Sequence, residues 1–178
     1  MSHGILLVDK PPGMTSHDVV AKVRRQLGMK SVGHAGTLDP LATGLMVLLL
    51  GEATKISDYL LNGDKGYIAE AQFGYVSDSL DVDTELRATN VNIPPSEHVL
   101  KEAKDMVGDL ELPVPLYSAV KLKGKKMVDQ ARKGVEQEAP LRSMEFMDVH
   151  ILKSEGSCLE VELQCQKGAF IRAWVNEL

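Results

Sequence analysis

The chain has 178 residues, 44% of them hydrophobic, which suits one globular domain with a sizeable core. Its longest apolar run, Leu45 to Leu50, is far shorter than the roughly twenty residues that span a bilayer. The start, MSHGILLVDK, lacks the features of a secretory signal, so we expect a cytoplasmic protein. The histidines and cysteines have no metal-ligand spacing, which argues against a metal site.

The net charge of −5 alone argues against a nucleic-acid partner, but the charge is unevenly distributed. Residues 67–116 hold three basic and ten acidic side chains. Residues 117–133 hold six cations and a single acid, Asp129. The cations are Lys121, Lys123, Lys125, Lys126, Arg132 and Lys133. This segment is either a solvated surface or a site that binds phosphates.

The first third of the chain predicts a strand at Ile5 to Val8, ended by Pro11-Pro12-Gly13. A helix follows, with Ser16 as its N-cap and Gly28 as its left-handed stop. Its apolar stripe is Val19, Val20, Val23 and Leu27. Leu45 to Leu50 predicts a buried strand, and Ala53 to Leu61 predicts a helix.

The rest of the chain predicts a strand at Tyr67 to Gly74, with Tyr67, Ala69, Ala71 and Phe73 on one face. A helix opens at Pro94-Pro95-Ser96, buries Val99, Leu100, Ala103, Met106 and Val107, and is closed by Gly108. Strands are expected at Tyr117 to Leu122, Met144 to Leu152 and Leu159 to Cys165, the last two forming a hairpin. Cys158 and Cys165 lie an odd number of positions apart, which places them on opposite faces as reduced thiols.

These elements alternate without a regular strand-helix-strand rhythm and include an antiparallel hairpin. The sequence therefore predicts an α/β (α+β) fold, a mixed, largely antiparallel sheet flanked by helices. No repeat or flexible linker divides the chain, so we expect one domain over residues 1–178.

The chemistry concentrates in Gly33 to Gly44, where three glycines and a proline surround one carboxylate, Asp39. Such a loop can present a single acid rigidly, although Asp39 could instead bond its own backbone in a structural turn. No Gly-Lys-Ser/Thr follows the glycines and no Gly-x-Gly-x-x-Gly occurs, which argues against ATP and NAD.

At this loop the sequence resembles the TruB-type tRNA pseudouridine synthases, which modify uridine 55 in the T loop of tRNA. The resemblance spans nearly the whole chain in ordered blocks. They are LLVDKPPGMTSHDVV (Leu6 to Val20), GHAGTLDPLATGLM (Gly33 to Met46), LGEATK (Leu50 to Lys55), DKGY (Asp64 to Tyr67), PLYSAVKLKGKKM (Pro115 to Met127), ARKG (Ala131 to Gly134) and CQKGAFIRAWV (Cys165 to Val175).

The resemblance implies the pseudouridine synthase catalytic fold and a reaction that moves uracil from a nitrogen to a carbon linkage with ribose. Net composition does not change, so no cofactor or metal is needed. Asp39 matches the family's nucleophile, Arg172 the arginine that pairs with it, and Tyr67 the active-site tyrosine. His34 matches a residue that inserts near the flipped nucleotide, and Lys10 a segment that supports the loop containing Gly36, Thr37 and Leu38.

The basic stretch coincides with the family's RNA-gripping loop, about residues 117–140, with Tyr117 lining the site. Its predicted contacts to the T arm of tRNA come from Lys121, Lys123, Lys125 and Lys126. The resemblance implies a monomer with tRNA as partner and no membrane. The chain has Ala169 and Phe170 where the family usually has threonine and tyrosine, and Val128 where it often has tyrosine.

The family continues beyond the position of Leu178, so the resemblance implies a C-terminally truncated chain. A helix from about Ala169 to Leu178 would then leave Phe170, Trp174 and Val175 exposed. Two other functions compete with catalysis: a non-catalytic RNA-binding or tRNA-folding module, and a hydrolase acting on nucleosides. The combination of Asp39, Tyr67 and Arg172 favours the synthase.

Overall fold

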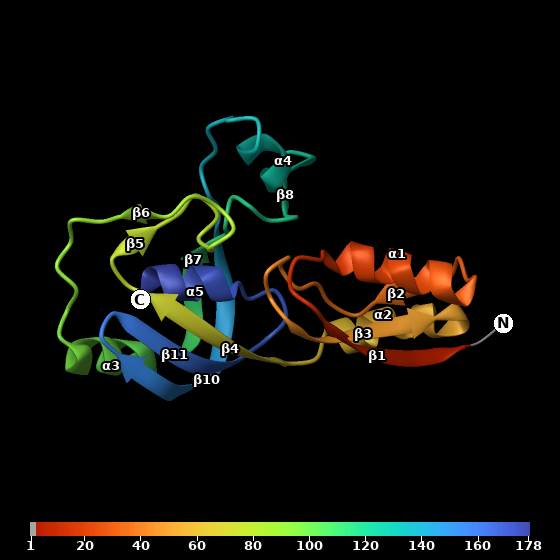
Figure 1. The fold of residues 1–178 in the computed structure, drawn as a ribbon, viewed down its shortest axis with the longest axis horizontal. Coiled ribbons are helices and arrows are strands. Elements are labelled where there is room, and N and C mark those ends of the chain that lie inside the picture. The colour runs from red at the N-terminus through yellow and green to blue at the C-terminus, as the bar shows by residue number, and fades with distance from the viewer. Residues whose placement is uncertain (1–2) are drawn as a thin grey trace. The chain divides into compact units, whose positions relative to one another are not determined.

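The computed structural model describes residues 3–178, and the chain separates into two compact units (Figure 1). The first comprises the described residues up to Gly63, and the second runs from Asp64 to Leu178. Each unit has its own sheet and its own cluster of buried apolar side chains. The expectation of one domain stays a prediction, and each unit is described by itself.

The first unit contains a three-stranded antiparallel sheet of order β1-β3-β2. The strands are β1 (Gly4–Lys10), β2 (Val32–His34) and β3 (Gly44–Leu50). The predicted strands at Ile5 to Val8 and Leu45 to Leu50 are confirmed. The sequence missed β2, because three residues that include a glycine carry too little periodicity to identify a strand.

Helix α1 (Ser16–Leu27) covers one face of this sheet. Val19, Val20 and Val23 are buried as predicted, and Gly28 ends the helix with φ of 60°. Leu27 is 49% exposed, so its place in the stripe was wrong. The predicted N-cap was also wrong: Thr15 caps the helix in a capping box with Asp18, which frees the Ser16 hydroxyl for another contact.

The single helix predicted for Ala53 to Leu61 is divided. A 3₁₀ helix, η1 (Gly51–Ile56), precedes the short α-helix α2 (Ser57–Leu61). The Thr54 hydroxyl donates to the Gly51 carbonyl at 2.8 Å, which supports the tighter three-residue turn.

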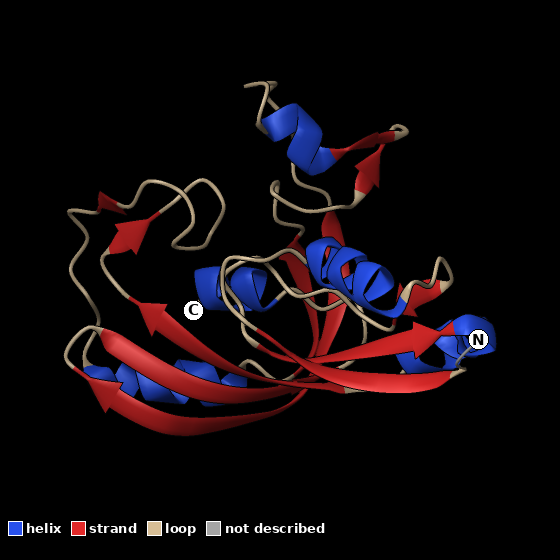
Figure 2. Cartoon of the chain, turned by 45° about the vertical axis from the view of Figure 1, so that its right-hand side comes forward, coloured by secondary structure: helices blue, strands red, loops and turns tan. Residues whose placement is uncertain are grey.

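The second unit is built on a four-stranded antiparallel sheet of order β4-β11-β10-β7 (Figure 2). The strands are β4 (Lys65–Gln72), β7 (Gly108–Pro113), β10 (Leu141–Glu155) and β11 (Cys158–Cys165). The β10–β11 hairpin is confirmed, and β10 extends beyond the predicted strand at both ends. Helices packed beside antiparallel sheets confirm the predicted mixed fold class.

The two faces of β4 and β11 follow the predicted alternation. Tyr67, Ala69 and Ala71 point toward the core, while Glu70 and Gln72 are exposed. Cys165 lies in the core and Cys158 lies with the opposite face, and both are free thiols. Burial raises the pKa of Cys165 to about 11, so its thiol stays protonated at neutral pH.

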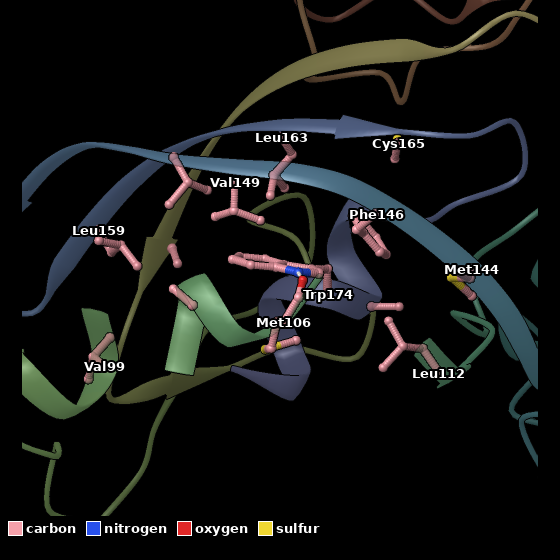
Figure 3. Close-up of a cluster of buried hydrophobic side chains, with 14 of the residues drawn as sticks. Val99, Met106, Leu112, Met144, Phe146, Val149, Leu159, Leu163, Cys165 and Trp174 are labelled. Atoms are coloured by element: carbon pink, nitrogen blue, oxygen red, sulfur yellow. Dashed lines mark hydrogen bonds between the residues drawn. The ribbon is translucent and has the colours of Figure 1, made fainter. Parts of the chain in front are cut away.

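Helices α3 (Ser96–Asp105) and α5 (Ile171–Glu177) bury side chains against the same face of this sheet. The prediction that the C-terminal helix leaves Trp174 exposed was wrong. Its ring is fully buried with its centroid 6.2 Å from that of Phe146, and its indole N–H donates to the Met106 carbonyl at 3.0 Å (Figure 3). Phe170 and Val175 are half-buried against the same core.

The end of α3 differs from the prediction. The helix ends at Asp105, Met106 is buried beyond it, and Val107 is 38% exposed. Gly108 does not close the helix but begins β7, which the sequence missed. The acidic residues Asp109 and Glu111 alternate with half-buried Leu110 and buried Leu112, a pattern too short to predict a strand beside a helix.

Three short elements with exposed cations follow the segment that contains Tyr117. They are β8 (Lys121–Leu122), β9 (Lys125–Lys126) and α4 (Met127–Ala131), which stand off from the four-stranded sheet in Figures 1 and 2. The predicted strand at Tyr117 to Leu122 was therefore wrong except for its last two residues. Within residues 3–178, no helix is long and apolar enough to cross a membrane.

Candidate active site

Asp39 lies in the irregular loop between β2 and β3 of the first unit, and it is exposed. Its neighbours in sequence, Leu38 and Pro40, are both held through backbone atoms by residues from the preceding turn and helix. The loop therefore presents a carboxylate to solvent on a backbone that is fixed on both sides.

Lys10 fixes the loop on the C-terminal side of Asp39. Its side chain is fully buried, and its ammonium donates to the carbonyls of Pro11 at 3.0 Å, Met14 at 2.8 Å and Pro40 at 2.9 Å. The Gly13 N–H also donates to Pro40, at 2.9 Å. Three acceptors satisfy the three protons of the ammonium, so Lys10 joins the proline turn to the residue after Asp39.

Burial lowers the pKa of Lys10, and the charge of Asp39 opposes this effect. The Lys10 ammonium is therefore attracted to the Asp39 carboxylate by charge, while its three hydrogen bonds go to the backbone carbonyls named above.

Ser16 fixes the loop on the N-terminal side of Asp39. Its hydroxyl accepts from the Leu38 N–H at 2.9 Å and donates to the Leu38 carbonyl at 3.1 Å. Ser16 is 4% exposed, so both contacts lie away from solvent. One hydroxyl thus satisfies both backbone groups of the residue before Asp39.

We expect Lys10→Met to lower the free energy of unfolding by about 3 kcal/mol. The substitution keeps the buried stem but leaves carbonyls without their donor, and an unsatisfied buried polar group costs about 1–3 kcal/mol. Urea denaturation measures the change. Lys22→Met, on the exposed face of α1, is the matched control and should change stability by less than about 0.5 kcal/mol. Equal stability of the two variants would contradict the role of Lys10.

The other predicted residues of this loop differ in exposure. Gly36 has φ of 143°, a conformation that side chains rarely adopt, and Thr37 is exposed. Leu38 is half-buried against the core of the first unit. His34 ends β2, and its Nδ1 is buried without a hydrogen-bond partner among residues 3–178.

Tyr67 lies on β4 in the second unit, opposite Leu163 of β11. Its side chain is half-buried and packs against the large core. The sheet therefore restricts its backbone, and the core restricts its side chain.

Arg172 lies in the first turn of α5 and is half-buried. One terminal nitrogen donates to the Ser79 carbonyl at 2.6 Å, and the other donates to the Tyr117 carbonyl at 3.2 Å. Two separate carbonyls therefore restrain the plane of its guanidinium. Tyr117 itself is half-buried, and the adjacent Ser118 hydroxyl is buried without a partner within residues 3–178.

The predicted RNA-binding lysines form a compact hairpin. Lys121 pairs with Lys126 and Leu122 with Lys125, around a turn in which Lys123 and Gly124 have φ of 50° and 82°. Positive φ at both central residues is typical of a type I′ hairpin turn. All four lysines are exposed, and within residues 3–178 none of them is in an ion pair.

Met127 anchors this hairpin. Its side chain is fully buried, its N–H donates to Val120 at 2.8 Å, and the Val128 N–H donates to Ser118 at 3.1 Å. The Gln137 side chain donates to the Met127 carbonyl at 3.1 Å. The lysines are therefore held on an ordered support.

A hollow in this unit is unsuited to phosphates. It has a volume of about 360 Å³ and contains five acidic side chains and none of the predicted site residues. The acids are Glu102, Asp105, Asp109, Glu111 and Glu177. In the described part of the chain, no group of three or more His, Cys, Asp or Glu residues is placed to hold a metal ion.

The structure thus groups the predicted residues within each unit. Lys10, His34, Gly36, Thr37, Leu38 and Asp39 belong to the first unit, and Tyr67, Tyr117, Arg172 and the lysines to the second. Within the second unit, Arg172 contacts the backbone of Tyr117. The pairing of Arg172 with Asp39 stays a prediction.

Sequence reasoning missed the side chain of Ser16 as a loop anchor. A signal was available in Thr15-Ser16-His17-Asp18, because an N-cap at Thr15 places an acid three residues later, as a capping box requires. Assigning the cap to Thr15 leaves the Ser16 hydroxyl available for a distant partner.

Curated relatives match along nearly the whole chain. A tRNA pseudouridine synthase B of Bdellovibrio bacteriovorus is 45% identical over 99% of this chain and 58% of its own length. The corresponding proteins of Caldicellulosiruptor saccharolyticus and Salmonella typhimurium are 42% and 40% identical. The chain spans between 56% and 61% of the length of these relatives.

Solved structures share the fold. A chain in the crystal structure of a Cbf5–Nop10–Gar1 complex has a TM-score of 0.74 and 26% identity over 98% of this chain and 43% of that one. A chain of an H/ACA RNP bound to a substrate RNA containing 2′-deoxyuridine has a TM-score of 0.70 and 23% identity, covering 98% of this chain and 41% of its own. The latter shows a common fold alone.

The family model described as the TruB family pseudouridylate synthase, N-terminal domain, matches residues 24–171. That range contains Asp39, Tyr67, Tyr117 and the hairpin lysines, and it ends one residue before Arg172. Together with the curated relatives, the match shows that this chain belongs to the TruB family of pseudouridylate synthases.

Proposed function

We propose that the protein is a tRNA pseudouridine synthase that isomerises uridine 55 in the T loop, with Asp39 as nucleophile. The observation that carries this proposal is the exposed Asp39 carboxylate on a loop whose neighbouring backbone is held by Ser16 and Lys10. A nucleophile must be correctly oriented, and these contacts fix the backbone on both sides of the Asp39 carboxylate.

The reaction separates into steps that side chains alone can perform. The glycosidic bond between ribose and the uracil nitrogen breaks, uracil turns while bound, and a carbon of uracil bonds to the sugar. The hydrogen that leaves this carbon is transferred to solvent as a proton, and the ring nitrogen released from ribose takes up a proton, so the composition does not change. Asp39 forms a transient covalent bond with the reaction intermediate, and this bond breaks before the product is released. Tyr67 stacks on uracil and assists removal of the proton from the carbon.

Access to the uridine requires extrusion from the folded T loop. In the proposal, His34, which is half-buried at the end of β2, inserts beside the flipped nucleotide. Arg172 stabilises the charge of Asp39. The two compact units together form one catalytic domain.

The β8–β9 hairpin binds phosphates of the T arm in this proposal. Its lysines are exposed and take part in none of the ion pairs found in residues 3–178, which supports that role although the net charge of the chain is −5. We further propose that the protein acts in the cytoplasm as a monomer without cofactor or metal, since the isomerisation needs neither redox chemistry nor an external group.

A tritium-release assay tests the proposed reaction. The chain is incubated with tRNA labelled with tritium at carbon five of uracil, because forming the new bond expels that hydrogen. Release together with pseudouridine at position 55 supports the synthase. Free uracil as product would indicate a nucleoside hydrolase, and tight tRNA binding without release or product would indicate a non-catalytic RNA-binding module.

The hairpin lysines provide a separate prediction. Replacing Lys123, Lys125 and Lys126 by alanine should weaken binding to matched and unmatched RNA alike, because phosphate contacts carry little sequence information. The slope of log affinity against log salt should flatten by about two units if three phosphate contacts are lost. Filter binding at several salt concentrations measures this slope.

The control for that experiment is the double variant of Lys101 and Lys104 on α3, whose lysines are also exposed. It should leave the salt slope unchanged. A slope that stays the same in the hairpin variant would show that the hairpin is only a solvated surface.

A further inference from the structure

The loop between β5 (Tyr75–Val76) and β6 (Arg87–Ala88) contains the carbonyl that holds Arg172. The two short strands pair with each other, and an ion pair between Asp78 and Arg87 closes the base of the loop. Inside the loop, Ser79 is 1% exposed. A buried serine in a polar surface loop requires hydrogen-bond partners, and this one has several.

The Ser79 hydroxyl is 2.5 Å from Oδ1 of Asp83 and 2.8 Å from the hydroxyl of Thr84. A carboxylate oxygen accepts, so the Ser79 hydroxyl donates to Asp83 and accepts a hydrogen bond from the Thr84 hydroxyl. The Ser79 N–H in turn donates to the Thr84 hydroxyl at 3.2 Å. This closed arrangement fixes both the side chain and the backbone nitrogen of Ser79.

The peptide group that joins Ser79 to Leu80 is restrained at both of its polar atoms. Its N–H, on Leu80, donates to the Ser77 carbonyl at 3.2 Å, and its carbonyl, on Ser79, accepts from Arg172. Leu80 has φ of 57°, a left-handed conformation that is unfavourable for a residue other than glycine. The surrounding hydrogen bonds maintain this unfavourable conformation, which orients the carbonyl.

We propose that Ser79 is a positioning residue for Arg172. Its buried hydroxyl network fixes the Ser79–Leu80 peptide, and that peptide, together with the Tyr117 carbonyl, sets the plane of the guanidinium. A carbonyl contact at 2.6 Å to a cation is a strong, charge-assisted hydrogen bond, so losing its direction weakens the restraint on rotation of the guanidinium. The catalytic consequence of this inference depends on the proposed function.

Ser79→Ala removes the hydroxyl and should lower kcat for tRNA by about thirtyfold while KM changes by less than about threefold. Ser79→Thr restores the hydroxyl and should recover most of kcat. Thr84→Val is the second variant, since it removes the partner hydroxyl with little change in shape, and should lower kcat in the same direction. The control is Ser154→Ala, an exposed serine on β10 in the same unit.

A readout independent of activity is the rotation of the Arg172 guanidinium, followed by nitrogen NMR of the side chain. The wild type and Ser154→Ala should show separate signals for the two terminal nitrogens. Ser79→Ala and Thr84→Val should show merged signals. If the wild type releases no tritium, the proposed function fails and NMR alone decides whether Ser79 holds Arg172.

Unmerged signals in both variants would overturn the inference. A normal kcat in Ser79→Ala and Thr84→Val, with an active wild type, would also overturn it, whatever the NMR result. A lower kcat that Ser79→Thr restores, with merged signals in the alanine variant, supports it.

Discussion

Asp39→Asn should lower the rate of tritium release by at least about a thousandfold, whereas its affinity for tRNA should change by less than about tenfold, or about 1.4 kcal/mol. An amide has nearly the shape of the carboxylate but is a much weaker nucleophile. The loop should keep its conformation, because Ser16 and Lys10 grip the backbone of Leu38 and Pro40 rather than the side chain of Asp39.

Single-turnover release and filter binding on the same preparation separate the two effects. Asp58→Asn changes an exposed carboxylate on α2 and should leave both quantities within about twofold of wild type. If Asp39→Asn lost turnover and affinity equally, the carboxylate would be a binding group rather than the nucleophile.

Trp174→Ala should lower the free energy of unfolding by about 3–5 kcal/mol, the range for removing a large aromatic side chain from a core. The ring is fully buried beside Phe146, and its N–H is the donor for the Met106 carbonyl at the end of α3. Trp174→Phe keeps most of the packing, so it should cost about 1–2 kcal/mol, mainly from the carbonyl left without its donor.

Urea denaturation followed by far-ultraviolet circular dichroism suits this test, because Trp174 is the one tryptophan of the chain and its fluorescence is lost in both variants. Tyr59→Ala is the matched control, since that aromatic ring is 83% exposed on α2. It should change stability by less than about 0.5 kcal/mol. A similar loss in Tyr59→Ala and Trp174→Ala would contradict the assigned core.

Elements with a long, regular pattern were predictable from the sequence. The alternation of β4 and β11 identified both strands and the inward face, and Gly28 marked the end of α1. The predictions failed for short elements: β2 and β7 carry too few periodic residues, and η1 has the apolar spacing of an α-helix.

The environment of Trp174 could not be predicted for a different reason. Its hydrogen-bond acceptor, Met106, is 68 residues away in the chain, and the apolar face of a terminal helix gives no sign of which distant element covers it. The sequence therefore predicted an exposed ring where tertiary packing buries it.

The candidate site was predictable where a residue's own neighbours determine its setting. The glycines around Asp39 indicated an irregular loop, and the lysines around Gly124 indicated a local positive charge. The partner of Ser16 and the role of Ser79 were not predictable, because both depend on a contact with a remote segment. The Ser16 hydroxyl bonds to the backbone of Leu38, and the Ser79 carbonyl accepts from the side chain of Arg172, which lies 93 residues away in the chain.

The hydrogen bonds that hold the Asp39 loop come from residues outside the loop. Ser16 and Lys10 reach backbone atoms that lie 22 and 30 residues further along the chain. These contacts hold the backbone of Leu38 and Pro40 and involve no other side chain of the loop. The exposed positions Thr37 and Leu41 can therefore vary without changing the backbone conformation. An upstream turn and helix therefore determine the conformation of the loop, while its exposed positions remain free to vary.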